Sequence, residues 1–373
     1  MKRIIIIGAG FAGLSAASRL SKLKGGFEIV LIDRKETFDF LPMLPDIIGR
    51  RISPASLTYK LDRFCKSYGC KFVRGEATGV DLAKRAVRGA CGDFTYDYLL
   101  IASGSETNFY GNQEIQKYAY KLDCVSDAVR ILQALGQDVF ETFIVAGGGY
   151  TGIEAATNLR RYCVRRGRSK NILIVDMAPS LLGPLPDWMK DYVARNLQKL
   201  DIGVCLNTVI KQAGKEGIGL SNGKFYNNAM LIWAAGVKTG DYIFGLNAEK
   251  SRQGRIKIED NLQLAEGCFV AGDAAQFLSR GMPLRMAVQF SIAQGNLAAL
   301  NILRSIEGKP LAKYIPLDLG FVIPMANNKS CGRVLGINLK GLFPTLLHYQ
   351  MCAYRTYGFI NKLRLARELI HLK

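Results

Sequence analysis

The sequence of 373 residues contains little histidine and no closely paired cysteines. Its two histidines, His348 and His371, leave the first 347 residues without a His metal ligand or a His general base. This argues against a Ser-His-Asp hydrolase and against HExxH zinc chemistry. The nine cysteines form no CxxC pair, which argues against a zinc ribbon, an iron–sulfur cluster and a secreted disulfide framework. We therefore expect no metal site and a reducing compartment.

The sequence also lacks a hydrophobic run that reads as a membrane span. The N-terminal MKRIIIIGAGFAGLSAAS imitates a signal peptide, but its four isoleucines end at once in a glycine motif, which indicates a strand and a turn. Residues 286–303 carry no charge, yet four amides within them would be unsatisfied in a bilayer: Gln289, Gln294, Asn296 and Asn301. We expect a buried helix there and no transmembrane helix.

Acidic residues are few relative to basic ones. Thirty-one Asp and Glu against fifty Lys and Arg give a formal net charge of +19. Such a charge favours anionic partners, among them phospholipid head groups, nucleic acid and phosphorylated ligands. Because no helix-turn-helix, RNP or zinc pattern accompanies the charge, we expect no nucleic-acid partner.

A glycine motif follows a β-branched run at the N-terminus. Ile4–Ile7 is typical of a strand covered on both faces, and it leads into Gly8-Ala9-Gly10-Phe11-Ala12-Gly13 and a helical segment. In GxGxxG the first glycine allows the turn, the second lets a pyrophosphate approach, and the third lets helix pack on strand. The next apolar strand ends at Asp33, 20 residues after Gly13, where a carboxylate accepts from a ribose hydroxyl. These residues, with the adjacent Arg34, predict a dinucleotide site.

The same pattern recurs near residue 147. A strand at 143–146 precedes Gly147-Gly148-Gly149-Tyr150-Thr151-Gly152, a helix over 153–161 and a strand at 172–175 that ends at Asp176. An acid at that strand end favours NADH, because a 2′-phosphate would meet like charge. A nearby basic cluster leaves NADPH open, although a solvated helix end and loop explain it more simply. The cluster consists of Arg160, Arg161, Arg165, Arg166 and Arg168.

Two nucleotide motifs in one chain indicate one resident and one diffusible cofactor. The arrangement makes sense if one motif holds a flavin and the other delivers a hydride to it. The sequence therefore predicts an α/β fold with two Rossmann-like dinucleotide-binding domains.

With these motifs the chain resembles the glutathione-reductase-like flavoproteins, and among them the type II, non-proton-pumping NADH dehydrogenases. The resemblance covers nearly the whole chain, and it implies FAD at the first motif, NADH at the second and a membrane quinone as acceptor. Three further segments match: Tyr96–Ser105 with Ala102 and Gly104, Leu231–Val237 with Gly236, and Cys268–Ala275 with Gly272, Asp273 and Ala274. The resemblance implies that Asp273 contacts the ribityl–phosphate end of FAD; the alternative is a cap of the next helix.

Three more segments are similar to those that distinguish the type II enzymes. Leu41 and Pro42 belong to an aromatic and proline-rich segment that the resemblance places against the flavin. Thr151 and Glu154 match the family's second glycine motif, and Glu154 would lie near the flavin and handle protons; the alternative is a hydrogen bond to cofactor or backbone. Residues 287–295 resemble the quinone-site motif, with Gln289 and Gln294 at its outer positions; the alternative is a polar stripe that satisfies flavin carbonyls.

Cysteine positions test two related families. Cys65 and Cys70 have the CxxxxC spacing of disulfide reductases, but Cys65 ends a helix-like segment over 56–65 and Cys70 begins a strand, so we expect buried structural thiols. Sulfide:quinone oxidoreductases need a cysteine inside the second glycine motif, where this chain has Thr151. Three other thiols keep that alternative open: Cys124, Cys163 and Cys331.

The last 34 residues are basic and amphipathic. From Lys340 onward the segment contains six basic residues and one acidic residue. Phe359, Leu363, Ala366 and Ile370 fall on one face of the expected helix. Such a segment predicts a monotopic foot on an anionic membrane; the alternative is a helix that docks on the same chain or across a dimer. The resemblance favours the membrane, with a possible homodimer, and places the chain at the cytoplasmic face as a peripheral protein.

We therefore expect four segments. Residues 1–110 begin the FAD domain, residues 111–240 form an inserted NAD(P)H domain, residues 241–325 complete the FAD domain, and residues 326–373 form a C-terminal amphipathic helical segment that faces the membrane or a second subunit. The expected activity is hydride transfer from NADH to FAD and electron transfer to quinone. The alternatives are a soluble reductase of a small redox protein, a sulfide:quinone oxidoreductase-like enzyme and an NADH-responsive redox sensor.

Overall fold

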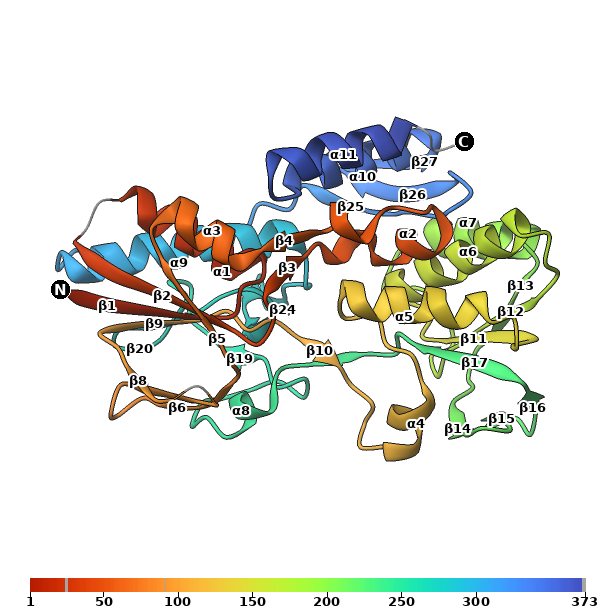
Figure 1. The fold of residues 1–373 in the computed structure, drawn as a ribbon, viewed down its shortest axis with the longest axis horizontal. Coiled ribbons are helices and arrows are strands. Elements are labelled where there is room, and N and C mark those ends of the chain that lie inside the picture. Colours follow the sequence, from red (N-terminus) through yellow and green to blue (C-terminus); the bar gives the residue numbers. More distant parts are fainter. Residues whose placement is uncertain (24–25, 91, 371–373) are drawn as a thin grey trace. The chain divides into compact units, whose positions relative to one another are not determined.

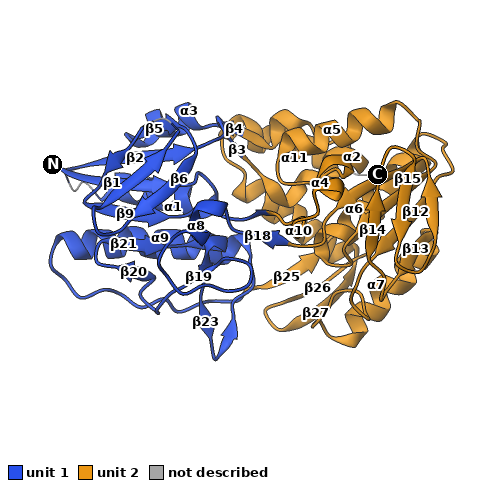
Figure 2. Ribbon diagram, turned by 90° about the horizontal axis from the view of Figure 1, so that it is seen from below, with its two compact units in different colours: residues 1–38, 59–106, 237–318 blue, residues 39–58, 107–236, 319–373 orange. Residues whose placement is uncertain are grey.

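The computed structural model describes residues 1–23, 26–90 and 92–370, so His371 and Cys91 lie outside the described residues. The chain divides into two compact units, coloured separately in Figure 2. Unit 1 comprises residues 1–38, 59–106 and 237–318, and unit 2 comprises residues 39–58, 107–236 and 319–373. The expected division placed residues 39–58 in the first flavin segment and residues 326–373 apart, whereas both belong to unit 2 in the structure.

A six-stranded sheet forms the centre of unit 1 (Figure 1). In spatial order its strands are β20 (Gln263–Ala265), β21 (Cys268–Val270), β9 (Tyr98–Ile101), β1 (Lys2–Ile7), β2 (Phe27–Asp33) and β5 (Lys71–Arg74). All neighbours pair in parallel except β20 and β21. Ile7 lies opposite both Ile32 and Ile101, so the carboxyl ends of the three central strands meet at one edge.

Different elements cover the two faces of this sheet. Ile5 and Ile7 point into a core shared with a small antiparallel sheet of β6 (Ala77–Asp81), β7 (Ala86–Gly89) and β8 (Phe94–Thr95). The alternate residues Ile4 and Ile6 point to the other face, where α1 (Phe11–Lys22) packs along α9 (Val288–Ile306). The two helices touch closely, since a Cβ at Gly295 would lie 2.2 Å from the Ala12 carbonyl oxygen. The helix α3 (Leu61–Tyr68) packs beside α1 and β5.

Unit 2 contains a four-stranded parallel sheet. Its order is β13 (Ile202–Cys205), β12 (Asn171–Val175), β11 (Thr142–Ala146) and β17 (Ala229–Trp233). One face packs on α5 (Val125–Gly136), α6 (Tyr150–Arg165) and α7 (Asp187–Lys199) through Phe143 and Val145. The opposite face packs on an antiparallel sheet of β14 (Ile210–Ala213), β15 (Gly217–Leu220) and β16 (Phe225–Asn227) through Ile144.

Three further segments complete unit 2. The short helix α2 (Leu44–Gly49) packs on α5 and α6. The strands β25 (Gly320–Ile323), β26 (Ser330–Val334) and β27 (Ile337–Gly341) form an antiparallel sheet that contacts α10 (Leu342–Arg355). The last helix, α11 (Phe359–Ile370), packs on α10 and on residues 54–56.

The remaining elements are short and are distributed over both units. The remaining helices are η1 (Leu41–Met43), η2 (Pro54–Ser56), α4 (Gln113–Tyr118), α8 (Asp241–Phe244) and η3 (Gly272–Ala274). The remaining strands are β3 (Thr37–Asp39), β4 (Thr58–Lys60), β10 (Glu106–Thr107), β18 (Val237–Lys238), β19 (Ile256–Lys257), β22 (Ala275–Gln276), β23 (Leu278–Ser279) and β24 (Met282–Pro283).

The predicted fold class, an α/β fold with two nucleotide-binding sheets and C-terminal helices, is confirmed. The prediction of a helix over 56–65 is wrong at both ends, because α3 begins at Leu61 and continues past Cys65 to Tyr68. The expected helix over 286–303 is α9, and its buried Asn301 donates to the carbonyls of Asn261 and Ala312. Within the described residues, no helix combines the length and the hydropathy needed to cross a membrane.

Candidate functional site

The glycine turn between β1 and α1 leaves no space for a side chain at two positions. Gly8 has a φ of +100°, and a Cβ there would lie 2.4 Å from the Ala102 carbonyl oxygen. A Cβ at Gly13 would lie 1.9 Å from the Gly8 carbonyl oxygen. Both glycines are therefore required by the chain itself, because strand, turn and helix approach one another at backbone distance.

Gly10, the second glycine of the motif, is under no such constraint. Its φ of −78° and ψ of −169° suit any L-residue, and no described atom lies within 4 Å of a Cβ built there. Gly10 is the N-cap residue immediately before α1, and it has no side chain to cap the N–H groups of the first turn. Gly10 is exposed at a helix N-terminus, and the fold itself does not require a glycine there. A pyrophosphate that must approach the backbone at this point explains why the residue is glycine.

Asp33 is held at the end of β2 beside this turn. Its Oδ2 accepts from the Ala9 N–H at 2.7 Å, and its Oδ1 accepts from the Lys35 N–H at 2.8 Å. A carboxylate has further lone pairs, so Asp33 can still accept from a ribose hydroxyl. The adjacent Arg34 is half exposed and pairs with Glu106 at 3.1 Å. The predicted acid at this strand end is thus oriented before a ligand arrives.

The turn between β11 and α6 repeats the same construction in unit 2. Gly147 has a φ of +109°, and a Cβ there would lie 2.5 Å from the Ala234 carbonyl oxygen. A Cβ at Gly152 would lie 1.8 Å from the Gly147 carbonyl oxygen. Gly149 has a φ of −81° and a ψ of −170°, with no described atom within 4 Å of a Cβ built there. Gly147 and Gly152 serve the chain, and Gly149 leaves space for a ligand.

Asp176 occupies the place in unit 2 that Asp33 occupies in unit 1. Its carboxylate accepts from the Gly148 N–H and, at 2.7 Å, from the Ala178 N–H. The residue stands immediately after β12, beside the second glycine turn. The negative charge at this point opposes a 2′-phosphate and favours NADH.

The interpretation of the arginine cluster near α6 as a solvated helix end holds only in part, because four of its five guanidinium groups donate to backbone carbonyls and Arg166 is exposed. Arg160 donates to the Lys170 carbonyl at 3.1 Å, Arg161 to the Ala326 carbonyl at 2.9 Å, and Arg168 to the Leu135 carbonyl at 2.9 Å. Arg165 donates to the Gly49 carbonyl at 2.5 Å. Arg160 to Arg165 lie at the C-terminal end of a helix of about 24 Å, away from the glycine turn. These guanidinium groups bind neighbouring segments, which weakens the argument for NADPH.

Asp273 lies in η3, close to the first glycine turn. Its Oδ2 accepts from the Ser105 hydroxyl at 3.2 Å, and burial raises the pKa of its carboxyl group while Arg255 lowers it. A Cβ at Gly272 would lie 3.1 Å from the Ala12 Cβ, so η3 touches the start of α1. The capping alternative is wrong, because the next helix, α9, begins 15 residues later at Val288.

Unit 1 therefore gathers most of the residues predicted for the flavin. The glycine turn, the loop after β9 and η3 are in contact within this unit. The residues gathered are Gly8, Gly10, Phe11, Ala12, Gly13, Asp33, Arg34, Ala102, Gly104, Gly272, Asp273 and Ala274. Leu41 and Pro42 instead belong to unit 2, in η1, where Leu41 is exposed.

The two glutamines of α9 both have hydrogen-bond partners in unit 1. The Oε1 of Gln294, a buried residue, accepts from the Gly272 N–H at 2.8 Å, which fixes the turn that carries Asp273. Gln289 lies two residues into α9 and donates to Asp318 at 3.1 Å, and Asp318 also pairs with Arg285. Gln294 thus supports the flavin side of the site, and Gln289 lies at the more exposed end of the helix.

Unit 2 gathers the other predicted residues around the second turn. Thr151 is exposed in the first turn of α6, and Glu154 lies one turn further along the helix. Burial raises the pKa of Glu154 well above its usual value, and the charge of Asp46 raises it further. Gly236 has a φ of +141°, which residues with a side chain rarely adopt, so this glycine is also required by the chain.

The sequence did not single out the group of Asp46, Arg50 and Tyr349 in unit 2, where α2 packs on the helix that carries Glu154. Asp46 and Arg50 lie in α2, and Tyr349 lies in α10. A signal was present in the sequence, since LPDIIGR places an acid inside an apolar segment and an arginine four residues later. Its partner Tyr349 lies 303 residues away, which no local pattern reveals.

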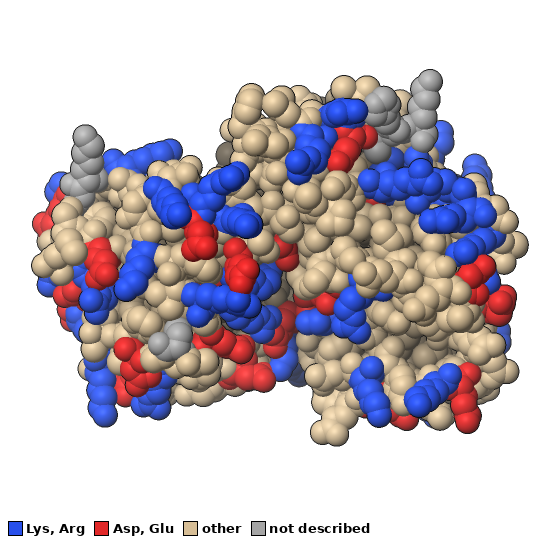
Figure 3. Space-filling model, viewed as in Figure 1, with Lys and Arg blue, Asp and Glu red and all other residues tan. Residues whose placement is uncertain are grey.

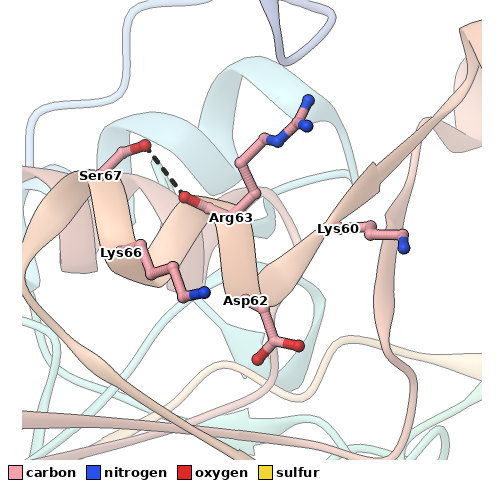
Figure 4. Close-up of a pocket in the computed structure, with 5 residues that line it drawn as sticks. All are labelled: Lys60, Asp62, Arg63, Lys66 and Ser67. Atoms are coloured by element: carbon pink, nitrogen blue, oxygen red, sulfur yellow. Dashed lines mark hydrogen bonds between the residues drawn. The ribbon is translucent and has the colours of Figure 1, made fainter.

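A separate depression of about 470 Å³ lies over α3 in unit 1 (Figure 4). It is lined by Lys60, Asp62, Arg63, Lys66 and Ser67. It is an open, charged surface, and none of the residues predicted for nucleotide binding lines it. The candidate site therefore consists of the two glycine turns and the groups around them.

Relatives of the chain share this organisation over their full length. A type II NADH:quinone oxidoreductase from Staphylococcus saprophyticus is 25% identical over 370 residues, covering 91% of each chain. The structure of NDH2 from Plasmodium falciparum in complex with NADH superposes with a TM-score of 0.86 at 16% identity, covering 99% of this chain and 97% of that one. The sulfide:quinone oxidoreductase from Aquifex aeolicus gives 0.82 at 17% identity, with coverage of 98% and 92%.

The family assignment rests on a match that spans both glycine turns and the segment that carries Asp273. The model of the pyridine nucleotide-disulphide oxidoreductases matches residues 2–295. This range contains the first and second nucleotide motifs and the first part of α9. The chain belongs to the pyridine nucleotide-disulphide oxidoreductase family.

Proposed function

We propose that this protein is a type II NADH:quinone oxidoreductase that holds FAD at the turn of Gly8–Gly13 and binds NADH at the turn of Gly147–Gly152. The observation that carries the proposal is the repeated turn, in which the fold itself leaves Gly10 and Gly149 open to a ligand. The full-length relatives in Staphylococcus support quinone as the acceptor. The activity involves no proton pumping.

The bound cofactors supply the hydride chemistry, and the chain supplies binding and orientation. Asp33 and Asp176 orient the two riboses, and the α1 and α6 N-termini bind the pyrophosphates. Asp273, fixed through Gln294 and Ser105, binds the ribityl–phosphate end of FAD. Glu154 holds a proton, Gln289 borders the quinone site, and Gln294 supports the site from within the fold by fixing the turn of Asp273. No protein nucleophile takes part.

The three thiols that left the sulfide alternative open argue against it. Burial raises the pKa of the Cys124 and Cys163 thiols, and it raises the pKa of Cys331 to about 12. A thiol must ionise to attack sulfur, so these three are poor nucleophiles. The position inside the second glycine motif is Thr151, which cannot form a disulfide. The chain thus retains the fold of the sulfide:quinone oxidoreductase without its thiol chemistry.

Steady-state oxidation of NADH by the full chain tests the proposed function. With a short-chain quinone we expect a turnover above about 1 per second, and with NADPH a kcat/KM at least about tenfold lower. Sulfide in place of NADH is the matched control and is expected to give no quinone reduction. Turnover far below this value with every acceptor would indicate a redox sensor, and turnover with a small redox protein alone would indicate a soluble reductase.

The C-terminal helices carry the surface that we assign to the membrane. In α11, Leu365 is fully buried and Glu368 accepts from the Ser56 hydroxyl at 3.0 Å, so one face docks on the chain. The opposite face exposes Phe359, Leu363 and Ile370, which are 57–79% accessible. The predicted apolar face is therefore not the face that docks.

The apolar surface continues from α11 onto α10. The exposed side chains of α10 are Leu342, Phe343, Leu346 and Tyr354. Figure 3 shows lysine and arginine side chains beside uncharged ones over α11. Apolar groups inserted below the head groups, with about 1 kcal/mol from each nearby cation, would hold the protein on an anionic leaflet. We therefore assign the chain to the cytoplasmic face of the membrane as a peripheral protein.

Replacing Phe359, Leu363 and Ile370 by serine is expected to weaken binding to anionic liposomes by at least about tenfold. Co-sedimentation measures the binding, and NADH oxidation with a water-soluble quinone is expected to stay unchanged. Serine at three other exposed valines, Val139, Val164 and Val209, is the matched control and should leave binding unchanged. If the α11 variant binds liposomes as the wild type does but no longer forms a dimer in solution, this face contacts a second subunit and not the membrane.

A further inference from the structure

A buried ion pair connects α2 to α10 inside unit 2. The Arg50 Nε lies 3.2 Å from the Asp46 Oδ1, and the two side chains are 0% and 5% exposed. The Tyr349 hydroxyl of α10 donates to the same Asp46 oxygen at 2.9 Å. An acid buried this deeply needs a cation and donors of this kind to remain ionised.

Arg50 is itself fixed from three directions. It donates to the Asn328 side-chain oxygen at 2.7 Å and to the Met325 carbonyl at 3.3 Å. Its guanidinium carbon also lies 4.9 Å from the centre of the Tyr349 ring. The cation therefore cannot leave Asp46 without breaking contacts to two other segments.

The helix α6 brings Glu154 to this ion pair. A Cβ at Gly49 would lie 2.7 Å from the Asn158 Cα, so α2 and α6 are in contact at this point. The Asn158 Nδ2 donates to the Glu154 carbonyl at 3.0 Å, and the Asn158 side chain also lowers the pKa of Asp46. Residues four apart on a helix share one face, so Glu154 lies on the face of α6 that packs on α2.

The protonation states of the group follow from its burial and charges. Burial raises the pKa of Asp46, while Arg50, Tyr349, Asn158 and Arg161 lower it. Burial also raises the pKa of Glu154 well above its usual value, and the charge of Asp46 adds to this shift. Two nearby carboxyl groups that cannot both ionise share their protons as a pair.

The other titratable side chains here stay neutral or lie beyond the pair. Burial lowers the pKa of His348 to about 4, so its ring carries no charge at neutral pH. Burial raises the pKa of Tyr349 and Cys352 well above their usual values. The charge of Arg355 opposes part of this rise in the pKa of Cys352. Of these groups, Glu154 is the carboxyl group that holds its proton more tightly because of the charge of Asp46.

We propose that Asp46 is a positioning residue for Glu154: its carboxylate, which Arg50 and Tyr349 hold in place on α2, adds a buried negative charge beside the face of α6 that carries Glu154 and so opposes a second negative charge there. The catalytic meaning rests on the proposed function. The net reaction, NADH + H⁺ + quinone → NAD⁺ + quinol, consumes one proton besides the hydride. Glu154 stores this proton on a carboxyl oxygen and regains it from water after each turnover.

The test is the pH titration of the Glu154 carboxyl group in the full chain. Infrared difference spectra follow its protonated C=O band, which is identified by its disappearance in Glu154→Gln. In Asp46→Asn the like charge is gone, so the band is expected to disappear at a pH about one unit lower than in the wild type. The alkaline limb of kcat for quinone reduction is expected to shift in the same direction.

Two further variants keep the test decisive where Asp46→Asn fails to fold. The double variant Asp46→Asn with Arg50→Gln removes both charges, which buried sites tolerate better than the loss of one; the same downward shift is expected. Asp46→Glu retains the charge and should restore a titration close to that of the wild type. An unchanged or upward shift in a folded Asp46→Asn or double variant would overturn the proposal. Absence of quinone reduction in the wild type would instead refute the proposed function, since the infrared titration needs no acceptor.

Discussion

Gly10→Val is expected to give a colourless protein that retains its fold. The backbone angles at Gly10 suit valine, and no described atom lies near its Cβ, so the substitution meets no steric conflict within the chain. The two valine methyl groups would occupy the space where the FAD pyrophosphate approaches the α1 N-terminus. We expect a loss of at least about tenfold in bound flavin, measured by the visible spectrum of the purified protein, and a corresponding loss of NADH oxidation.

The free energy of unfolding of the flavin-free forms provides the control. It is expected to agree between the wild type and Gly10→Val within about 1 kcal/mol, because valine is a poorer N-cap residue than glycine but meets no clash. Gly214→Val is the matched variant, because this glycine also has ordinary backbone angles and open space at its Cβ, and it lies outside both turns. It should keep its colour. A yellow Gly10→Val protein with normal activity would show that no pyrophosphate binds at this turn.

Gly149→Val is expected to separate the two nucleotide sites. The geometry at Gly149 repeats that at Gly10, so the fold should again be unaffected. The protein should stay yellow, and its kcat/KM for NADH should fall by at least about 100-fold, because the nicotinamide nucleotide can no longer reach the α6 N-terminus. Stopped-flow measurement of flavin bleaching by NADH follows this loss directly.

The acceptor half of the reaction is the internal control for Gly149→Val. Flavin reduced chemically by dithionite should be reoxidised by quinone at the wild-type rate. Normal kinetics with NADH in this variant would show that the second turn is not the NADH site. A colourless Gly149→Val protein beside a yellow Gly10→Val protein would show that the two cofactors occupy the opposite turns.

Local sequence patterns were sufficient for the two nucleotide turns. Each turn depends on residues within about 35 positions: an apolar strand, three spaced glycines and an acid at the next strand end. The structure places Asp33 and Asp176 at equivalent positions because adjacent parallel strands bring their carboxyl ends together. The amphipathic face of α11 was also predictable, since it depends on spacing within one helix.

Long-range packing explains what the sequence did not reveal. The arginines of α6 were interpreted as solvated because their acceptors are backbone carbonyls of distant segments, such as Gly49 and Ala326. The same holds for Asp46, whose partners lie on α6 and α10. The placement of residues 39–58 in unit 2 follows from these contacts, which join α2 to helices more than 100 residues away. Hydrophobic periodicity carries no information about such pairings.

The glycines of each turn would have separate evolutionary fates in a descendant that abandoned redox chemistry. Gly8, Gly13, Gly147 and Gly152 would persist, since even a methyl group there would collide with the backbone of the same chain. Gly10 and Gly149 would be free to drift toward larger residues as soon as no nucleotide was needed. The residues at these two positions therefore distinguish a working dehydrogenase from an inactive paralogue with the same fold.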